Sequence, residues 1–367
     1  SIVILEDEIL DILPTKNVFD GYEANEVFAL SEHIIMPGFI NNHTHAAMSL
    51  LKGFANDVPL KSWLEDYIWP AEKEYVSEAF VKDGSLIAIA EMIKSGTTTF
   101  NDMYFYPNQT AEAAVEMGIR ANIGLVVMEF PTNYASDPDD YLKKGLDFRD
   151  QWRGDGLIST SLAPHAPYTT SDKTLNTIGT YADQLNMTIH THLHETKEEV
   201  ENSINQYKAT PIQRYKSLGL LGPNLMAAHC THVDESDLNL LHQNNVNVVH
   251  NPSSNLILGS GIADISKMLD LGINVSIGTD SSASNNRLDV LEEVRLAALL
   301  GKGLNHQPEI LDSKNVFKMA TYNAAKAMNK SKMIGSIEPN KKADIVAINL
   351  DSIFSQPVYN PLTSLLY

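Results

Sequence analysis

The feature that most limits the fold of this chain is a regular alternation of short apolar segments with longer amphipathic ones. The apolar segments have the length of β-strands, and most are separated by segments in which apolar residues recur with helical spacing. The eight predicted strands are Ile34–Asn41, Thr97–Phe100, Ala121–Val127, Ile158–Leu162, Met187–His192, Leu225–Ala228, Val246–His250 and Val275–Gly278. Strands that alternate with helices form a parallel sheet.

The predicted helices explain how such a sheet is connected. They include Ser77–Ser95, Gln109–Met117, Lys173–Leu185, Pro211–Leu218, Glu235–Asn244 and Ile262–Leu271. Glycines at 96, 118, 219 and 272 mark helix ends, because glycine readily adopts the left-handed conformation found there. Eight strands in 367 residues predict an α/β fold, a closed (β/α)8 TIM-type barrel. An open doubly wound sheet is the alternative, but no glycine-rich phosphate loop follows any strand.

The two ends of the chain contain shorter apolar segments between turns, such as Ile2–Leu5 and Ala343–Ile348. We expect the ends to pair in a small discontinuous β-sandwich domain of residues 1–35 and 335–367, with the barrel in 36–334. Two unrelated tails are the alternative. The chain starts within an apparent strand and stops in an apolar stretch. We therefore also expect a few residues to precede Ser1 and a further strand to follow Tyr367.

Composition limits the partners of this chain. A formal charge of −19 argues against binding to nucleic acid or an anionic membrane, since both require a basic face. The single cysteine, Cys230, excludes an internal disulfide and is typical of a cytoplasmic protein. No apolar run approaches the roughly 20 residues that span a bilayer.

Histidines gather where the predicted strands end, which is where barrel enzymes carry their active sites. His43 and His45 lie one residue apart after the first strand, so their side chains share a face and can bind one metal ion. Taken alone, the pair is explained equally well as two strand histidines that are one residue apart by chance. The other strand ends carry His165, His190, His192, His194, Glu195, His229, His232, His250 and Asp280.

The motifs at these strand ends occur in a specific order. Pro-Gly-Phe-Ile-Asn-x-His-x-His begins at Pro37 and is followed by His-x-x-Glu, Ala-His-Cys, His-Asn-Pro and Gly-Thr-Asp-Ser. This set resembles the amidohydrolase superfamily, and within it the branch that includes 5′-methylthioadenosine/S-adenosylhomocysteine deaminases. The resemblance covers essentially the whole chain, including the tail segment Gly335–Asp344.

The resemblance implies that His43, His45, His192 and Asp280 bind a metal ion. Three imidazoles and one carboxylate leave a coordination position for water, as a hydrolytic zinc site requires. We expect one divalent ion per subunit, Zn²⁺ before Fe²⁺, which accepts the same ligands. Two-metal members of the superfamily commonly carry a modified lysine at the end of the fourth strand, but that strand ends here in Leu162–His165.

The resemblance also assigns the catalytic groups. Glu195 is expected to move a proton from water to the ring nitrogen beside the amidine carbon, which requires a raised pKa. His229 would orient the water or stabilise the developing charge, and Asp280 would carry the second proton to the departing ammonia. The alternatives are a cap of the helix Lys197–Gln206 for Glu195 and a packing role for His229. We expect His190, His194, His232 and His250 to hold neighbouring side chains in place or to pack in the interior, and Cys230 to pack in the barrel wall. A position in the pocket beside Asn251 is the alternative for His250.

For the substrate, the resemblance places Trp63 and Glu72 in a nucleoside pocket. A carboxylate suits the two ribose hydroxyls, since it accepts two hydrogen bonds at once. His165 would contact a purine nitrogen and Ser284 would complete the pocket. An ordinary amphipathic helix is the alternative for Trp63 and Glu72.

The segment Gly124–Pro131 departs from members that handle S-adenosylhomocysteine well, because it contains no arginine to bind the amino-acid carboxylate. We therefore expect deamination of 5′-methylthioadenosine, with S-adenosylhomocysteine and adenosine as weaker substrates. Alternatives are a guanine, cytosine or triazine substrate, or an inactive metal-binding barrel. Resembling enzymes are often dimers or tetramers, so we expect a homo-oligomer.

Overall fold

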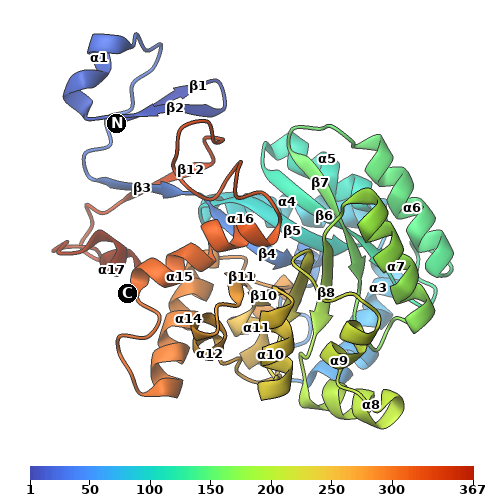
Figure 1. The fold of residues 1–367 in the computed structure, drawn as a ribbon. Helices are drawn as coiled ribbons and strands as arrows, with labels where there is room; N and C mark the ends of the chain where they lie inside the picture. The colour runs from blue at the N-terminus through green and yellow to red at the C-terminus, as the bar shows by residue number, and fades with distance from the viewer.

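The computed structural model describes all 367 residues and contains an eight-stranded parallel sheet that curls into a barrel (Figure 1). Each strand pairs with the next one along the chain. The strands are β4 (Phe39–Thr44), β5 (Thr97–Tyr104), β6 (Arg120–Val127), β7 (Ile158–Pro164), β8 (Ile189–Leu193), β9 (Leu225–His229), β10 (Asn247–His250) and β11 (Asn274–Ile277). The predicted TIM-type barrel is confirmed.

The first and last strands are joined by a single parallel bridge, between Thr44 and Asp280. The backbone N–H of Asp280 donates to the carbonyl of His43 at 2.9 Å. Beside this bridge the side chains of Asn41 and Thr279 also join the strands, because Asn41 Nδ2 donates to Thr279 Oγ1 at 2.8 Å. The barrel therefore closes through residues that are, or lie next to, the predicted metal ligands.

Helices surround the sheet (Figure 1). The longer ones are α3 (Trp69–Tyr75), α4 (Glu78–Lys94), α5 (Pro107–Met117), α6 (Pro138–Gln151), α7 (Asp172–Leu185), α8 (Lys197–Tyr207), α9 (Pro211–Ser217), α10 (Glu235–Gln243), α14 (Val290–Asn305) and α15 (Ser313–Met319). The shorter ones are η1 (Thr15–Asn17), α1 (Val18–Gly21), η2 (Ala46–Leu51), α2 (Leu60–Ser62), η3 (Trp63–Ile68), α11 (Pro252–Ile257), α12 (Ile265–Asp270), α13 (Ser282–Asn285), α16 (Tyr322–Ala327) and α17 (Pro361–Leu366). Most of them contribute apolar side chains to a cluster of 71 buried residues, and α16 packs in a second cluster of nine. The short helices η1, α1 and α2 contain no buried residue. None of the helices combines the length and the apolar character needed to cross a bilayer.

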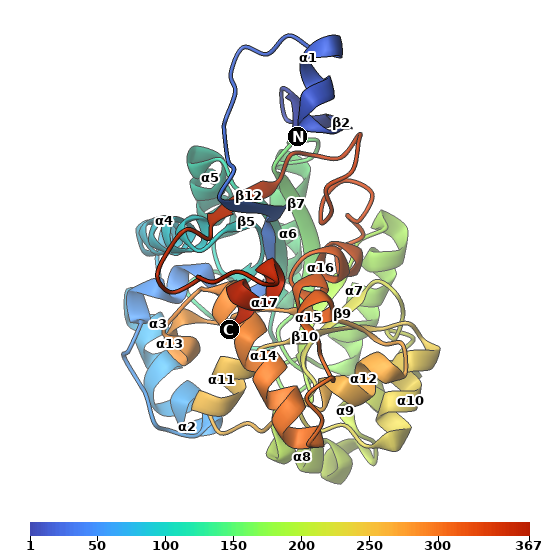
Figure 2. The same ribbon diagram turned by 90° about the vertical axis from the view of Figure 1, so that its left-hand side faces the viewer.

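The N-terminal segment and the C-terminal segment lie side by side and contain two small antiparallel sheets (Figures 1 and 2). One sheet pairs β1 (Ile2–Leu5) with β2 (Glu8–Ile12), and the other pairs β3 (His33–Pro37) with β12 (Ile345–Asn349). Backbone hydrogen bonds also join β2 to the residues that precede β12. Because β3 leads directly into β4, this part of the molecule lies at the end of the barrel where the strands begin. The expected boundary between residues 35 and 36 falls inside β3.

The prediction of one continuous strand over Ile34–Asn41 is wrong. Gly38 separates β3 from β4, and these strands belong to different sheets. A Cβ atom at Gly38 would lie 2.2 Å from the side chain of Thr98, so only glycine allows the chain to pass this close to β5. The Pro-Gly pair at 37 and 38 is the sequence signal for this break.

A largely buried ion pair, in which the Arg120 side chain is 6% and the Asp344 side chain 17% exposed, connects the barrel to the C-terminal part of the chain. Arg120, at the start of β6, donates from Nε and Nη2 to the two carboxylate oxygens of Asp344 at 3.0 and 3.2 Å, and from Nη1 to the carbonyl of Gly156 at 2.6 Å. Asp344→Ala would leave this guanidinium without its partner. We expect it to lower the free energy of unfolding by about 3 kcal/mol.

Urea denaturation followed by circular dichroism measures this change. The control is Lys143→Ala, which removes an exposed ion pair with Asp147, and we expect it to leave the free energy of unfolding unchanged. Equal stability of the Asp344→Ala variant and the wild type would show that the pair does not hold the C-terminal part on the barrel.

Candidate active site

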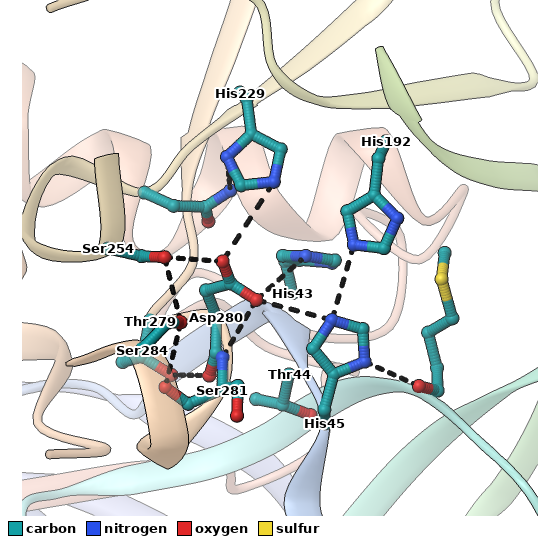
Figure 3. A network of polar contacts seen from close by, with 12 residues as sticks. His43, Thr44, His45, His192, His229, Ser254, Thr279, Asp280, Ser281 and Ser284 are labelled. Carbon is teal, nitrogen blue, oxygen red and sulfur yellow. Dashed lines mark hydrogen bonds and ion pairs between the residues drawn. The ribbon is translucent and has the colours of Figure 1, made fainter. Parts of the chain in front are cut away.

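Four polar side chains meet at the end of the barrel where the strands finish (Figure 3). His43 is in β4, His45 follows it, His192 is in β8, and Asp280 follows β11. All four are buried, and one ligand atom from each lies within 4.8 Å of the others. The Nε2 atoms of His43 and His45 lie 3.3 and 3.2 Å from the same oxygen, Oδ1 of Asp280.

The hydrogen bonds of these histidines show that the site suits a cation. Nδ1 of His45 lies 2.6 Å from the carbonyl of Met103, and Nδ1 of His192 lies 2.7 Å from the carbonyl of His165. A carbonyl only accepts, so each Nδ1 carries a proton, and in the neutral imidazole each Nε2 then presents a lone pair. These two Nε2 atoms face each other at 3.2 Å, and Nε2 of His43 has no hydrogen-bond partner. Lone pairs this close repel unless a cation lies between them, so the residues present fit a divalent metal ion.

Electrostatics favour the metal-binding protonation states of Asp280 and His192. At His45, burial would lower the pKa, but contacts with Asp280 outweigh it and raise that pKa to about 8, so this imidazole would lose a proton on binding a metal. Burial alone would raise the pKa of Asp280, but contacts with His43 and His45 outweigh it and hold that pKa well below its usual range. Burial lowers the pKa of His192 well below its usual value. An ionised carboxylate and a neutral imidazole are the forms that act as ligands.

The backbone around these ligands is unusually tight. A Cβ atom on Gly278 would lie 2.5 Å from Oδ1 of Asn251 and 2.7 Å from Cβ of His43, so glycine is required for β11 to approach β4 here. Asp280 and His229 adopt left-handed conformations, with φ of 63° and 77°. Such conformations are unfavourable for residues other than glycine and cluster at functional sites, where the surrounding structure imposes them.

Glu195 and His229 lie next to the four-residue cluster. Nε2 of His229 is 3.8 Å from Oε2 of Glu195 and 3.9 Å from Oδ2 of Asp280. Nδ1 of His229 is 2.7 Å from the amide oxygen of Asn255, which fixes the ring so that Nε2 faces both carboxylates. Glu195 is 4% exposed, and its only side-chain hydrogen bond is accepted from Ser260 at 3.3 Å. Burial raises the pKa of Glu195, as a group that both takes and gives a proton near neutrality requires.

A largely apolar pocket opens from this cluster. It brings together the four predicted substrate residues, Trp63 from η3, Glu72 from α3, His165 after β7 and Ser284 from α13. The rest of its lining is His45, Met48, Leu60, Leu64, Ile68, Trp69, Met103, Tyr104, Phe105, Val126, Met128, Tyr168, His192, Glu195, His229, Leu258 and Asp280. Two acidic and several aromatic side chains thus share one cavity with the metal-binding cluster.

The chain from residue 34 to residue 365 matches the model of the Amidohydrolase family. The chain belongs to the amidohydrolase family. A relative of this amidohydrolase, the 5-methylthioadenosine/S-adenosylhomocysteine deaminase of Saccharophagus degradans, is 45% identical over 360 residues, which are 98% of this chain and 81% of the relative. The predicted family and the predicted hydrolase class are confirmed.

Solved structures resemble this amidohydrolase closely. A zinc-bound adenosine deaminase from Xanthomonas campestris has a TM-score of 0.96 and 40% identity, over 98% of this chain and 82% of that one. Atrazine chlorohydrolase TrzN from Arthrobacter aurescens TC1, crystallised with zinc, has a TM-score of 0.91 over 100% of this chain and 86% of that one. It is only 23% identical, so it shows the shared fold alone.

Glu199 supports the amidohydrolase site, although the sequence analysis did not assign it a role. Its carboxylate accepts hydrogen bonds from the backbone N–H groups of His194 and Glu195 at 2.9 and 2.7 Å. Thr196 in turn accepts from the N–H of Glu199 and caps α8. The pattern Thr-x-x-Glu before a helix predicts a capping box, in which Glu199 would accept from the N–H of Thr196. The structure instead directs this carboxylate to the two residues that precede Thr196.

His190, His194, His232 and His250 are not among the residues that line the pocket. Nε2 of His190 lies 2.8 Å from Nδ1 of His43. His194 joins the loop after β8 to its neighbours, because its Nδ1 lies 2.8 Å from the carbonyl of His232. Cys230 is fully buried in the core cluster, and burial raises the pKa of its thiol.

Proposed function

We propose that this amidohydrolase removes the amino group of an adenine nucleoside by hydrolysis, and that 5′-methylthioadenosine is its preferred substrate. One observation carries the proposal: a single pocket is lined by His45, His192 and Asp280 of the four-residue cluster, by a buried glutamate beside them and by a second glutamate suited to a ribose. The names of the relative from Saccharophagus degradans and of the structural neighbour from Xanthomonas campestris support the same reaction.

His43, His45, His192 and Asp280 would hold the metal ion, and one cluster of this kind supports one ion per subunit. The ion, for which we propose zinc, would acidify a water molecule and so supply a nucleophile at neutral pH. The fourth barrel strand contains no lysine that could join a second ion. A homo-oligomer and a cytoplasmic location stay predictions.

The protein side chains would move two protons. Glu195 would take one from the attacking water and give it to the ring nitrogen next to the carbon that is attacked. His229, fixed by Asn255, would face the developing charge. Asp280 would pass the second proton to the amino group, which leaves as ammonia while the ring carbon becomes a carbonyl. The buried environment that raises the pKa of Glu195 suits this shuttle.

The lining of the pocket supports a small apolar 5′ substituent. No lysine or arginine lines it. Val126 and Met128, from the segment that lacks arginine, contribute apolar groups. The one acid of that segment, Glu129, is engaged elsewhere, because it accepts hydrogen bonds from Ser171 N and Thr174 Oγ1 at 2.8 and 2.6 Å.

We predict that kcat/KM is highest for 5′-methylthioadenosine and lower for adenosine and S-adenosylhomocysteine. The amino-acid carboxylate of S-adenosylhomocysteine would be buried without a cationic partner, which is unfavourable. The decrease in ultraviolet absorbance on deamination measures each rate. A higher kcat/KM for S-adenosylhomocysteine would contradict the ranking, and turnover of guanine, cytosine or a triazine but of no adenine nucleoside would overturn the proposed function.

A further inference from the structure

Tyr104 makes the only hydrogen bond within the chain to the carboxylate of Glu72. Its hydroxyl donates to Oε1 of Glu72 at 2.8 Å. Both side chains line the pocket, and Tyr104 is 5% exposed. The second carboxylate oxygen of Glu72 forms no hydrogen bond with the chain, so it is available to a ligand.

The two residues come from very different parts of the fold. Tyr104 is the last residue of β5, in the wall of the barrel. Glu72 lies on the seven-residue helix α3, in the connection between β4 and α4. The hydroxyl of Tyr104 therefore fixes a carboxylate on a peripheral helix relative to the rigid strands that carry the metal ligands. His45, for example, is held by the carbonyl of Met103, the residue next to Tyr104.

This contact also affects the ionisation of Glu72. Burial raises the pKa of its carboxyl group to about 7, and the hydrogen bond from Tyr104 opposes the rise. A neutral carboxyl group would donate from one oxygen, whereas an ionised one accepts at both. The ionised form accepts at both oxygens and more strongly, so it is the form better suited to accept from two hydroxyls of a ribose at the same time.

We infer that Tyr104 is a positioning residue for ribose recognition, which holds the Glu72 carboxylate so that its remaining lone pairs accept the 2′- and 3′-hydroxyls of the nucleoside. This inference rests on the proposed function. Tyr104 acts through Glu72, so its hydroxyl matters only for substrates that carry both hydroxyls. A ribose that lacks one of these hydroxyls donates only one hydrogen bond, so the orientation of the Glu72 carboxylate affects its binding little.

The test compares Tyr104→Phe with the wild type on 5′-methylthioadenosine and on its 2′-deoxy and 3′-deoxy counterparts. We expect kcat/KM for the ribonucleoside to fall about tenfold, mainly through KM, since a hydrogen bond to a charged group is lost. For both deoxynucleosides we expect a change of less than about twofold, because the aligned pair of acceptors is not used. In a Glu72→Gln background, Tyr104→Phe should no longer change the ratio of ribo to deoxy rates.

The control is Tyr141→Phe, which removes the hydroxyl of a fully buried tyrosine outside the pocket and should leave this ratio unchanged. Should the phenylalanine variant fail to fold, Tyr104→Met tests the same loss of the hydroxyl. An equal loss of kcat/KM for all three substrates, or effects of Tyr104→Phe and Glu72→Gln that multiply independently, would overturn the inference. Absence of nucleoside deamination by the wild type would instead overturn the proposed function.

Discussion

Glu195→Gln is expected to keep the metal ion bound while kcat falls about 10³-fold. The amide has nearly the same shape as the carboxylate and is not one of the four clustered ligands, so the site should keep its geometry. It cannot accept a proton from water or deliver one to the purine ring. The carboxylate of Glu195 is deeply buried and lies 3.8 Å from His229, so its loss removes the acidic group that stands beside the cluster.

Steady-state rates on 5′-methylthioadenosine, together with metal analysis of the same preparations, measure this effect. The matched control is Glu129→Gln, which makes the same chemical change at a carboxylate outside the pocket and should keep kcat within about twofold of the wild type. A fully metal-loaded Glu195→Gln variant with unchanged turnover would remove Glu195 from the mechanism.

Removal of the metal ion with a chelator is expected to abolish activity and to lower the melting temperature. Without a cation the Nε2 lone pairs of His45 and His192 repel at 3.2 Å, and a ligand that binds only the folded state stabilises it by about 4 kcal/mol at a thousandfold excess over Kd. One equivalent of Zn²⁺ per chain should restore both properties.

Metal content, activity and thermal unfolding are measured on three preparations: the wild type, His192→Ala and His242→Ala. His192→Ala should bind metal weakly and be inactive, whereas His242→Ala, at an exposed position in α10, should behave as the wild type. Full activity after complete removal of the metal would contradict the proposed chemistry. A ratio near two ions per chain in active enzyme would contradict the single site.

Much of this molecule can be predicted from the sequence because its strongest signals are local. The strands of the barrel are short apolar runs, and the predicted ligands lie at or just after their carboxyl ends in a fixed order, as do His43, His192 and Asp280. The ends of α4, α5 and α9 follow from glycines with positive φ at 96, 118 and 219. Barrel topology then brings the strand ends together, so distant residues become neighbours without any knowledge of their contacts.

What the sequence did not reveal depends on contacts between segments. The break at Gly38 comes from its approach to Thr98 and from the pairing of β3 with β12, which outweigh the continuous apolar pattern of Ile34–Asn41. The contact between Tyr104 and Glu72 depends on the path of the connection after β4, which has no periodic pattern. Such contacts appear only when the loops are placed in space.

The bridge that closes the barrel bears on the order of events during biosynthesis. Asn41 and Thr279 are 238 residues apart, and closing so long a loop is entropically unfavourable, so contacts of this kind form slowly. The ribosome releases His43 and His45 long before Asp280, so an emerging chain has these imidazoles without the fourth predicted ligand, and its sheet has an open edge. The complete four-residue cluster therefore forms only after the eighth strand has reached the first.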